Sequence, residues 1–229
     1  MLFVAIMATP SYMNAQELKT FLEDVTMDLH VGFAGSAYHN APISSKEGGG
    51  GLVGVNVGVR ASKPFLDIND KTYLYGGLGI DYTPKGGELA YNHEAIGSSM
   101  LHANYIEIPI HAGINRRITR GISLFAEVGT YMAYGVAGES EAPDHYDGKI
   151  KTFEEVLNPF DAGILLRYGS NFGKSFRLEI GGNLGLINAS KENALSKVML
   201  RSDKVYMTTF YFTLSWKISG QRKNTGVRK

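Results

Sequence analysis

Two histidines are the residues of this sequence best placed for acid–base chemistry. His30 and His111 fall on the polar side of alternating segments, and Asp28 and Glu107 share that side. A histidine next to a carboxylate can act as a general base. The same residues also fit a packed polar network in the interior of a protein, and we favour the network.

Other potentially reactive residues lack the spacing that their chemistry requires. Ser98 and Ser99 lie near His102 but outside a nucleophile-elbow motif. Four histidines occur in the long connections without the spacing of metal ligands: His39, His93, His102 and His145. One acidic stretch lacks the EF-hand spacing, so a solvated loop is favoured over a calcium site: Glu139, Glu141, Asp144 and Asp147. We expect no catalytic residue, no metal and no cofactor.

A larger set of ionisable residues shares the polar side of the alternating segments. It comprises Asp28, His30, Arg60, Asp81, Glu107, His111, Glu127, Asp161, Arg167, Arg177, Glu179 and Lys217. Acids and bases are nearly balanced, as expected for ion pairs enclosed in a narrow interior, because buried charges persist only when they are paired. We expect Glu107 and Glu127 to pair with arginines of this set, namely Arg60, Arg167 or Arg177.

Strands must position these residues, because the dominant hydrophobic period of the chain is two. The clearest example is Tyr105–Asn115, where Ile106, Ile108 and Ile110 alternate with polar or small residues. Eight segments follow this pattern: Thr26–Ser36, Gly51–Ser62, Thr72–Thr83, Tyr105–Asn115, Ile122–Val136, Phe160–Tyr168, Phe176–Ile187 and Val205–Ile218. The sequence therefore predicts an all-β protein.

The connections between these segments alternate in length. Long ones cover residues 37–50, 84–104, 137–159 and 188–204, and short ones cover 64–71, 116–121 and 169–175. This alternation is typical of an eight-stranded antiparallel up-and-down transmembrane β-barrel with short periplasmic turns and long extracellular loops. Both termini should then lie on the periplasmic side.

A soluble eight-stranded barrel such as a lipocalin would show the same alternation with its faces exchanged. A face exposed to water is usually rich in lysine and glutamate, whereas the polar face here carries glycine, tyrosine and a few ionisable groups. We therefore favour the membrane barrel. Aromatic residues on the apolar face support it, since Tyr168, Phe176 and Trp216 would lie near the periplasmic interface.

Composition and the chain ends agree with this location. The net charge of +1 gives no reason to expect nucleic-acid binding, and the absence of cysteine excludes disulfides and cysteine-ligated metals. Residues 1–15 carry no charge and contain an apolar run, as in a signal peptide. We expect a signal peptide over 1–15, the barrel over 16–220 and a basic tail over 221–229.

Pro109 fits the pattern least well. It lies inside the most regular segment, yet proline has no N–H for a strand ladder and a closed barrel has no edge to accommodate it. We expect a β-bulge at Pro109. The alternative is that the partner carbonyl turns inward and accepts a hydrogen bond from a donor in the lumen, such as His111 or an arginine. The outward isoleucines keep one parity across Pro109, so a bulge there must be compensated nearby or reduce to a simple missing bond.

Two short elements carry a family resemblance. Tyr82–Gly87, which contains Lys85, Gly86 and Gly87, and Tyr105–Ile110, which contains Tyr105, Glu107 and Pro109, resemble the outer-membrane β-barrel domain family of Bacteroidetes, including its PorT-like branch. The resemblance implies an eight-stranded barrel with extracellular loops and implies no catalytic residues.

These observations predict a non-enzymatic barrel in the outer membrane. Its partners should be membrane lipid and a protein bound at the extracellular loops or the periplasmic face, as in an accessory of a secretion-type complex. Two alternatives stay open, namely an integral membrane enzyme acting on lipid or peptide and the soluble binding barrel. An open porin is disfavoured because eight strands leave little lumen.

Overall fold

The computed structural model describes residues 25–39, 51–90, 98–141, 149–191 and 204–219. The expected signal peptide over 1–15 and the basic tail over 221–229 lie outside these ranges. So do His93, His145, Asp144 and Asp147, which belonged to the candidate metal ligands.

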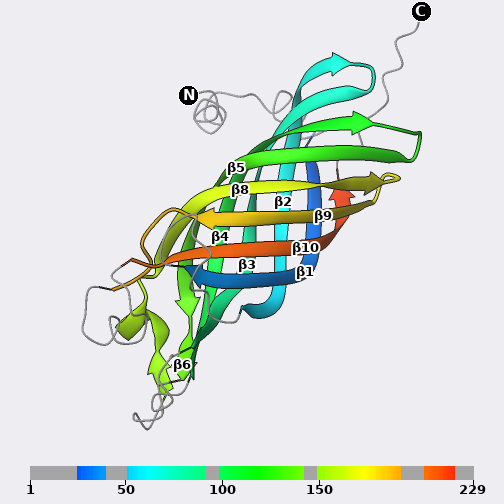
Figure 1. Cartoon of the computed structure of the whole chain (residues 1–229). Coiled ribbons are helices and arrows are strands. Elements are labelled where there is room, and N and C mark those ends of the chain that lie inside the picture. The colour runs from blue at the N-terminus through cyan, green and yellow to red at the C-terminus, as the bar shows by residue number, and fades with distance from the viewer. Residues whose placement is uncertain (1–24, 40–50, 91–97, 142–148, 192–203, 220–229) are drawn as a thin grey trace, which may run out of the picture.

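Eight antiparallel strands close into a barrel in the order β1-β10-β9-β8-β5-β4-β3-β2 (Figure 1). They are β1 (Thr26–His39), β2 (Leu52–Asn69), β3 (Thr72–Ala90), β4 (Ser98–Arg117), β5 (Ile122–Ala137), β8 (Phe160–Phe172), β9 (Phe176–Gly185) and β10 (Tyr206–Ser219). Two short strands, β6 (Glu139–Glu141) and β7 (Lys149–Lys151), form a separate sheet, and one turn of π-helix, η1 (Thr152–Val156), follows. The predicted fold class is confirmed.

Several strands extend beyond their predicted ends. β3 continues to Ala90 and β4 already begins at Ser98, so most of the long connection expected over 84–104 is paired strand. Gly86 and Gly87, interpreted as loop residues because glycine usually breaks a strand, lie in β3 opposite His102 and Leu101. β9, in contrast, ends at Gly185, two residues before its predicted end.

The register fixes how strongly the strands are tilted. Following paired residues once around the barrel from Met27 leads back to β1 at Ala37, ten residues further along. A stagger of this size requires the strands to be tilted by roughly 35–45° to the barrel axis. The small circumference and the tilt together leave an interior that side chains can fill.

The two ends of the barrel differ in their connections. Three turns, at residues 70–71, 118–121 and 173–175, lie at the end where β1 starts and β10 finishes, and we call this the turn end (Figure 1). The longer connections emerge at the opposite end, the loop end. This arrangement agrees with the predicted topology of an up-and-down barrel.

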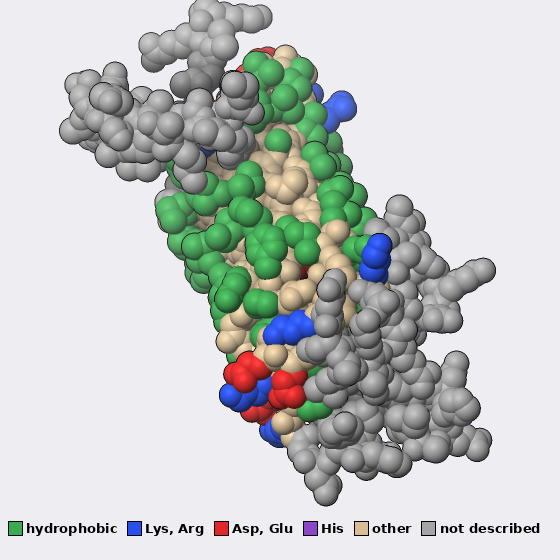
Figure 2. Space-filling model, turned by 90° about the vertical axis from the view of Figure 1, so that its left-hand side faces the viewer, with side chains coloured by type: hydrophobic (Ala, Val, Ile, Leu, Met, Phe, Trp, Pro, Cys, Tyr) green, Lys and Arg blue, Asp and Glu red, His purple; other side chains and the backbone are tan. Residues whose placement is uncertain are grey.

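The outer wall is apolar, and it decides between the two kinds of barrel. Half or more of the surface of residues such as Phe33, Leu166, Phe210 and Trp216 is exposed, whereas the charged side chains midway along the strands, such as Arg60, Glu127 and Arg167, are buried. Figure 2 shows hydrophobic side chains covering the middle of the visible face, with most charged side chains towards its ends. On β10 the outward row from Tyr206 to Ile218 spans roughly 30 Å along the barrel axis, similar to the apolar band of an outer-membrane barrel. A soluble barrel would have the opposite faces.

Pro109 does not cause the bulge that the sequence led us to expect. Its register with Tyr131 of β5 is regular. Towards β3, the register passes from the pair Leu78–Ile110 to Asp81–Glu107 without a shift, and among the described strand residues only the two pairs in between are absent. Loss of the single N–H of Pro109 explains both missing pairs, because each depends on that donor. The correct description is therefore a missing hydrogen bond in an unshifted register.

Candidate functional site

The candidate site is the interior of the barrel, where charged side chains form two groups. The turn-side cluster contains the three arginines Arg60, Arg167 and Arg177 and the three carboxylates Asp81, Glu127 and Glu179. The loop-side cluster contains Lys85, Glu107 and Asp161. All nine side chains are almost completely buried.

Glu179 and Glu127 are the centre of the turn-side cluster. Arg60 donates to Glu179 (Nη1 to Oε2, 2.8 Å), and Arg177 donates to the same oxygen at 2.8 Å and to Glu127 Oε1 at 2.6 Å. Tyr75 adds a hydrogen bond to Glu127 Oε1 at 2.8 Å. The guanidinium carbon of Arg177 also lies 3.5 Å from the centre of the Phe125 ring. Glu127 thus has the arginine partner that the sequence suggested.

Arg167 extends this cluster towards the loop end. Its guanidinium lies 3.4 Å from Asp81 Oδ2 and 3.6 Å from Glu179 Oε1. Asp28 is also buried, opposite Arg60 on β2 and Lys217 on β10 in the register.

The two interior histidines belong to the same cluster. His30 Nε2 lies 3.3 Å from Asp81 Oδ1, and His111 Nε2 lies 3.5 Å from Glu127 Oε1. Neither histidine pairs with Asp28 or Glu107, the carboxylates considered from the sequence. Both are about 98–99% buried, so no substrate in solution can reach them without a change of structure.

Lys85 is the residue that sequence reasoning placed wrongly. We expected Glu107 to pair with an arginine, but its Oε1 lies 2.6 Å from Lys85 Nζ, which also donates to Asp161 Oδ2 at 2.8 Å. The aromatic rings of Tyr105 and Tyr131 lie 5.0 and 4.6 Å from this ammonium group. The alternation of inward and outward side chains along β3 could have placed Lys85 in the interior, because Lys85 continues the inward row of Asp81 and Thr83.

Neutral hydrogen-bond donors stabilise the loop-side cluster, in which two carboxylates face one ammonium group. Thr83, Asn183 and Tyr211 all donate to Glu107 Oε2 at 3.1–3.2 Å. Tyr131 donates to Asp161 Oδ2 at 2.9 Å. Buried carboxylates retain their charge at lower cost when such donors surround them.

Glycines on β3 allow the neighbouring strands β2 and β4 to approach it closely. A Cβ atom at Gly86 would lie 2.1 Å from the carbonyl oxygen of Leu101 on β4. Gly79, opposite Pro109, would bring a Cβ within 2.9 Å of the Val59 carbonyl oxygen and 3.2 Å of the Pro109 ring. The two elements of the family resemblance thus lie on the adjacent strands β3 and β4, where Gly86 allows the close approach and Lys85 pairs with Glu107.

A cap covers the loop end of the barrel. It consists of β7, η1 and residues 157–159, and it buries Val156 and Leu157 completely. Phe153 packs edge-on against Tyr105 with ring centres 5.2 Å apart and occupies the space beside Gly135. Backbone hydrogen bonds from Asn158 to Ala189 and from Lys191 to Val156 attach the cap to the following connection. No hydrophobic period marks residues 149–159 in the sequence, so the cap was not predicted.

β6 and β7 form a hairpin that is separate from the barrel sheet, and its charged side chains face outward. Lys149 Nζ contacts Glu139 Oε2 at 2.7 Å, and this hydrogen bond lowers the pKa of the Glu139 carboxyl below its usual value. Both side chains are largely exposed, so the pair contributes little to stability.

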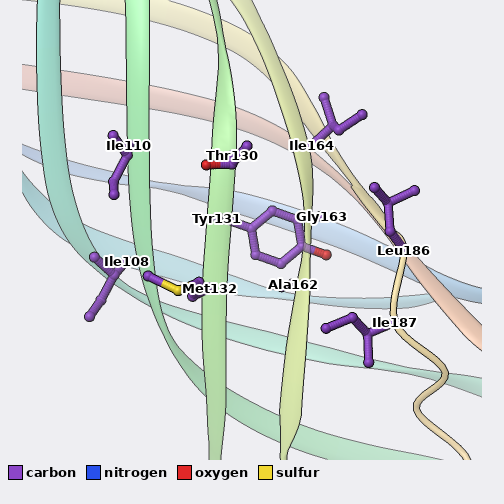
Figure 3. A pocket seen from close by; sticks show the side chains of 10 residues that line it. All are labelled: Ile108, Ile110, Thr130, Tyr131, Met132, Ala162, Gly163, Ile164, Leu186 and Ile187. Atoms are coloured by element: carbon purple, nitrogen blue, oxygen red, sulfur yellow. The ribbon is translucent and has the colours of Figure 1, made fainter. Parts of the chain in front are cut away.

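A shallow groove of about 350 Å³ lies on the outer wall. Figure 3 shows its lining on three neighbouring strands, with Ile108 and Ile110 on β4, Met132 on β5 and Ile164 on β8. The lining is almost entirely apolar, and it lies within the apolar band. It offers acyl chains a surface but no arrangement of polar groups for catalysis.

Among the described residues, no three or more His, Cys, Asp and Glu side chains are grouped to hold a metal ion. In the same part of the chain, no helix has the length and hydropathy to cross a membrane.

Comparison with known proteins assigns the family. The model of the outer membrane protein beta-barrel domain family matches residues 14–191, more than half of the chain. The chain belongs to this family. Its location is accordingly the outer membrane, in agreement with the apolar wall of the barrel.

Solved outer-membrane barrels are similar to this barrel at low identity. Ail of Yersinia pestis shares 11% identity, with 85% of this chain and 99% of that chain covered and a TM-score of 0.39. Neisserial surface protein A shares 12% (83% and 96% covered, TM-score 0.43), and OprG of Pseudomonas aeruginosa shares 11% (85% and 96% covered, TM-score 0.44). No curated protein sequence matches the chain. The assignment therefore rests on the family model and on the barrel itself.

Proposed function

We propose that this barrel is a non-enzymatic outer-membrane protein that acts through its loop end as an accessory of a membrane complex. The observation that carries the proposal is the filled interior, in which nine charged side chains pair with one another. A lumen occupied in this way offers neither a solute path nor an accessible reactive group. The function must then reside at the surfaces that remain, which are the two ends and the lipid-facing wall.

The loop end is the better candidate for a protein partner. Its cap has a defined fold with a buried apolar core, and it presents exposed charged residues of both signs, including Lys151 and Glu154. Charges of both signs can be matched by opposite charges on a protein partner, whereas an anionic lipid surface attracts basic residues alone. The resemblance to the PorT-like branch supports a role in a secretion-type complex.

Site-specific photocrosslinking in cells tests this proposal. A photoreactive amino acid replaces Glu154 on the cap or, as a control, Val57 on the lipid-facing wall, which is about 41% exposed. We expect a discrete protein adduct from the cap position and only lipid adducts from Val57. Lipid adducts alone from both positions would contradict the proposal.

The enzyme alternative is tested separately with the purified barrel. Incubation with phospholipid or lipopolysaccharide, followed by mass spectrometry of the extracted lipid, should show no new lipid species. Turnover of either lipid would contradict the non-enzymatic assignment and would favour an active site outside the filled interior.

A further inference from the structure

The turn end carries a group of basic residues that the interior network does not use. Residues 116–121 and 173–175 contain three arginines and one lysine and no acidic residue: Arg116, Arg117, Arg120 and Lys174. All four side chains are exposed. We call this group the basic ledge.

Hydrogen bonds between neighbouring turns make the ledge one connected surface. The Gly173 N–H donates to the Gly121 carbonyl at 2.7 Å, which joins the β8–β9 turn to the β4–β5 turn, and the two turns lie side by side in Figure 1. Arg117 donates through its backbone N–H to the Lys71 carbonyl and through Nη2 to the Asp70 carbonyl, each at 2.7 Å. These bonds attach the ledge to the β2–β3 turn and hold its charges in place.

The ledge begins where the apolar band ends. On β4 the outward row of isoleucines finishes at Ile114, and the next outward residue is Arg116. Lys174 lies between Phe172 and Phe176, two exposed aromatic residues. Near the same end, the rings of Phe176 and Trp216 lie 6.0 Å apart on the outer wall. Aromatic residues and long basic side chains at this depth reach the headgroup region of a bilayer.

The loop end differs from the ledge because the basic residues of β7 are paired with acidic ones. There, Lys149 pairs with Glu139 and Lys151 pairs with Glu154, so basic groups have acidic partners close by. The ledge has no acid within its own two turns. The neighbouring β2–β3 hairpin carries Asp67 and Asp70 beside Lys71, so the positive surface at the level of lipid phosphates is that of the two ledge turns.

We propose that the basic ledge binds the phosphate groups of anionic phospholipids in the leaflet that surrounds the turn end. Arg116 and Arg120 bind from the β4–β5 turn and Lys174 binds from the β8–β9 turn, while Arg117 holds the turns together. Guanidinium groups suit this role because they donate several hydrogen bonds to one phosphate. This contact with lipid is independent of the protein contact proposed at the loop end.

Lipid selectivity measured by electron spin resonance tests the inference. The full chain is refolded in phosphatidylcholine vesicles, and the association of spin-labelled phosphatidylglycerol is compared with that of spin-labelled phosphatidylcholine. We expect a several-fold preference for phosphatidylglycerol at low salt. The preference should fall when salt is raised, because salt screens exposed charges.

Two variants that each lose three positive charges show which end of the barrel causes the preference for phosphatidylglycerol. Arg116→Gln/Arg120→Gln/Lys174→Gln should abolish the preference, while Lys149→Gln/Lys151→Gln/Lys191→Gln at the loop end should keep it. Both are first checked for heat-modifiable gel mobility as evidence of folding. No preference in the unmodified protein, or an unchanged preference in the folded ledge variant, would overturn the inference. If the ledge variant does not fold, a preference in the unmodified protein that persists at high salt overturns it, and one that is lost there supports it.

Discussion

Lys85 and Glu107 form a buried ion pair between adjacent strands, with Nζ 2.6 Å from Oε1 and about 1% or less of each side chain exposed. They come from the two separate sequence elements that carry the family resemblance. Their pairing gives a physical reason for the two elements to occur together, since a buried lysine needs its carboxylate and a buried carboxylate needs its base.

Replacing Lys85 by Met should therefore destabilise the barrel strongly. The change leaves Glu107 and Asp161 buried without their shared base, which costs about 3–5 kcal/mol when one partner of a buried pair is removed. Urea unfolding of the barrel in lipid vesicles measures this loss. Lys151→Met, an exposed lysine of the cap, is the control and should leave the midpoint unchanged; equal midpoints for both variants would show that Lys85 is solvated.

Glu127 is predicted to be equally important at the turn side. Glu127→Ala leaves Arg177 and Arg60 with Glu179 as their shared carboxylate, and the expected loss is again about 3–5 kcal/mol. Thermal unfolding followed by heat-modifiable gel mobility detects it, with the exposed Glu139→Ala as the control. An unchanged thermal midpoint for both Glu127→Ala and Glu107→Ala would contradict the buried network.

Pro109→Ala should restore the missing hydrogen bond to β3. The new N–H of residue 109 points towards the Gly79 carbonyl, because the pairing lapses on that side alone. Hydrogen exchange followed by NMR should show this amide to be as strongly protected as that of Ile110. Rapid exchange at residue 109 in an otherwise protected strand would mean that the ladder is open there for another reason.

The cap depends on Phe153, whose ring fills the space beside Gly135 and contacts Tyr105. Phe153→Ala removes this contact and should loosen residues 149–159 while the barrel stays folded. Limited proteolysis of the refolded protein should then cleave within the cap faster than in the unmodified protein. Lys149→Ala, in the exposed β6–β7 hairpin, serves as the control; the same rate in all three proteins would show that Phe153 does not hold the cap.

Alternation allowed the barrel and most of its interior residues to be predicted. A period of two places every second residue on one face, so Arg60, Glu127 and Arg177 could be assigned to the interior without knowledge of the register. The ion-pair partners of these residues were harder to predict, because they depend on which side chains face each other across the lumen. Arg60 and Glu179, for example, are 119 residues apart in sequence.

Lys85, Pro109 and the cap show why the rest was not predicted. Gly86 and Gly87 suggested a loop, so Lys85 was not counted on the interior face, although close approach of Leu101 is the reason for glycine at position 86. The strand tolerates the missing hydrogen bond at Pro109 without a bulge, because the register with β3 continues unshifted on both sides. The cap is held by contacts between segments distant in sequence, such as the hydrogen bond from the Lys191 N–H to the Val156 carbonyl, and its sequence shows no hydrophobic period.

Conductance of the purified barrel in a planar lipid bilayer tests most directly the claim that the interior is closed. The filled lumen and the cap predict no current steps above the leak of the lipid bilayer at any applied voltage. A wide porin inserted in the same bilayer confirms that channels can be detected. Stable, reproducible current steps from this barrel would contradict the account, because ions could then pass where the structure places Lys85, Arg177 and their carboxylates.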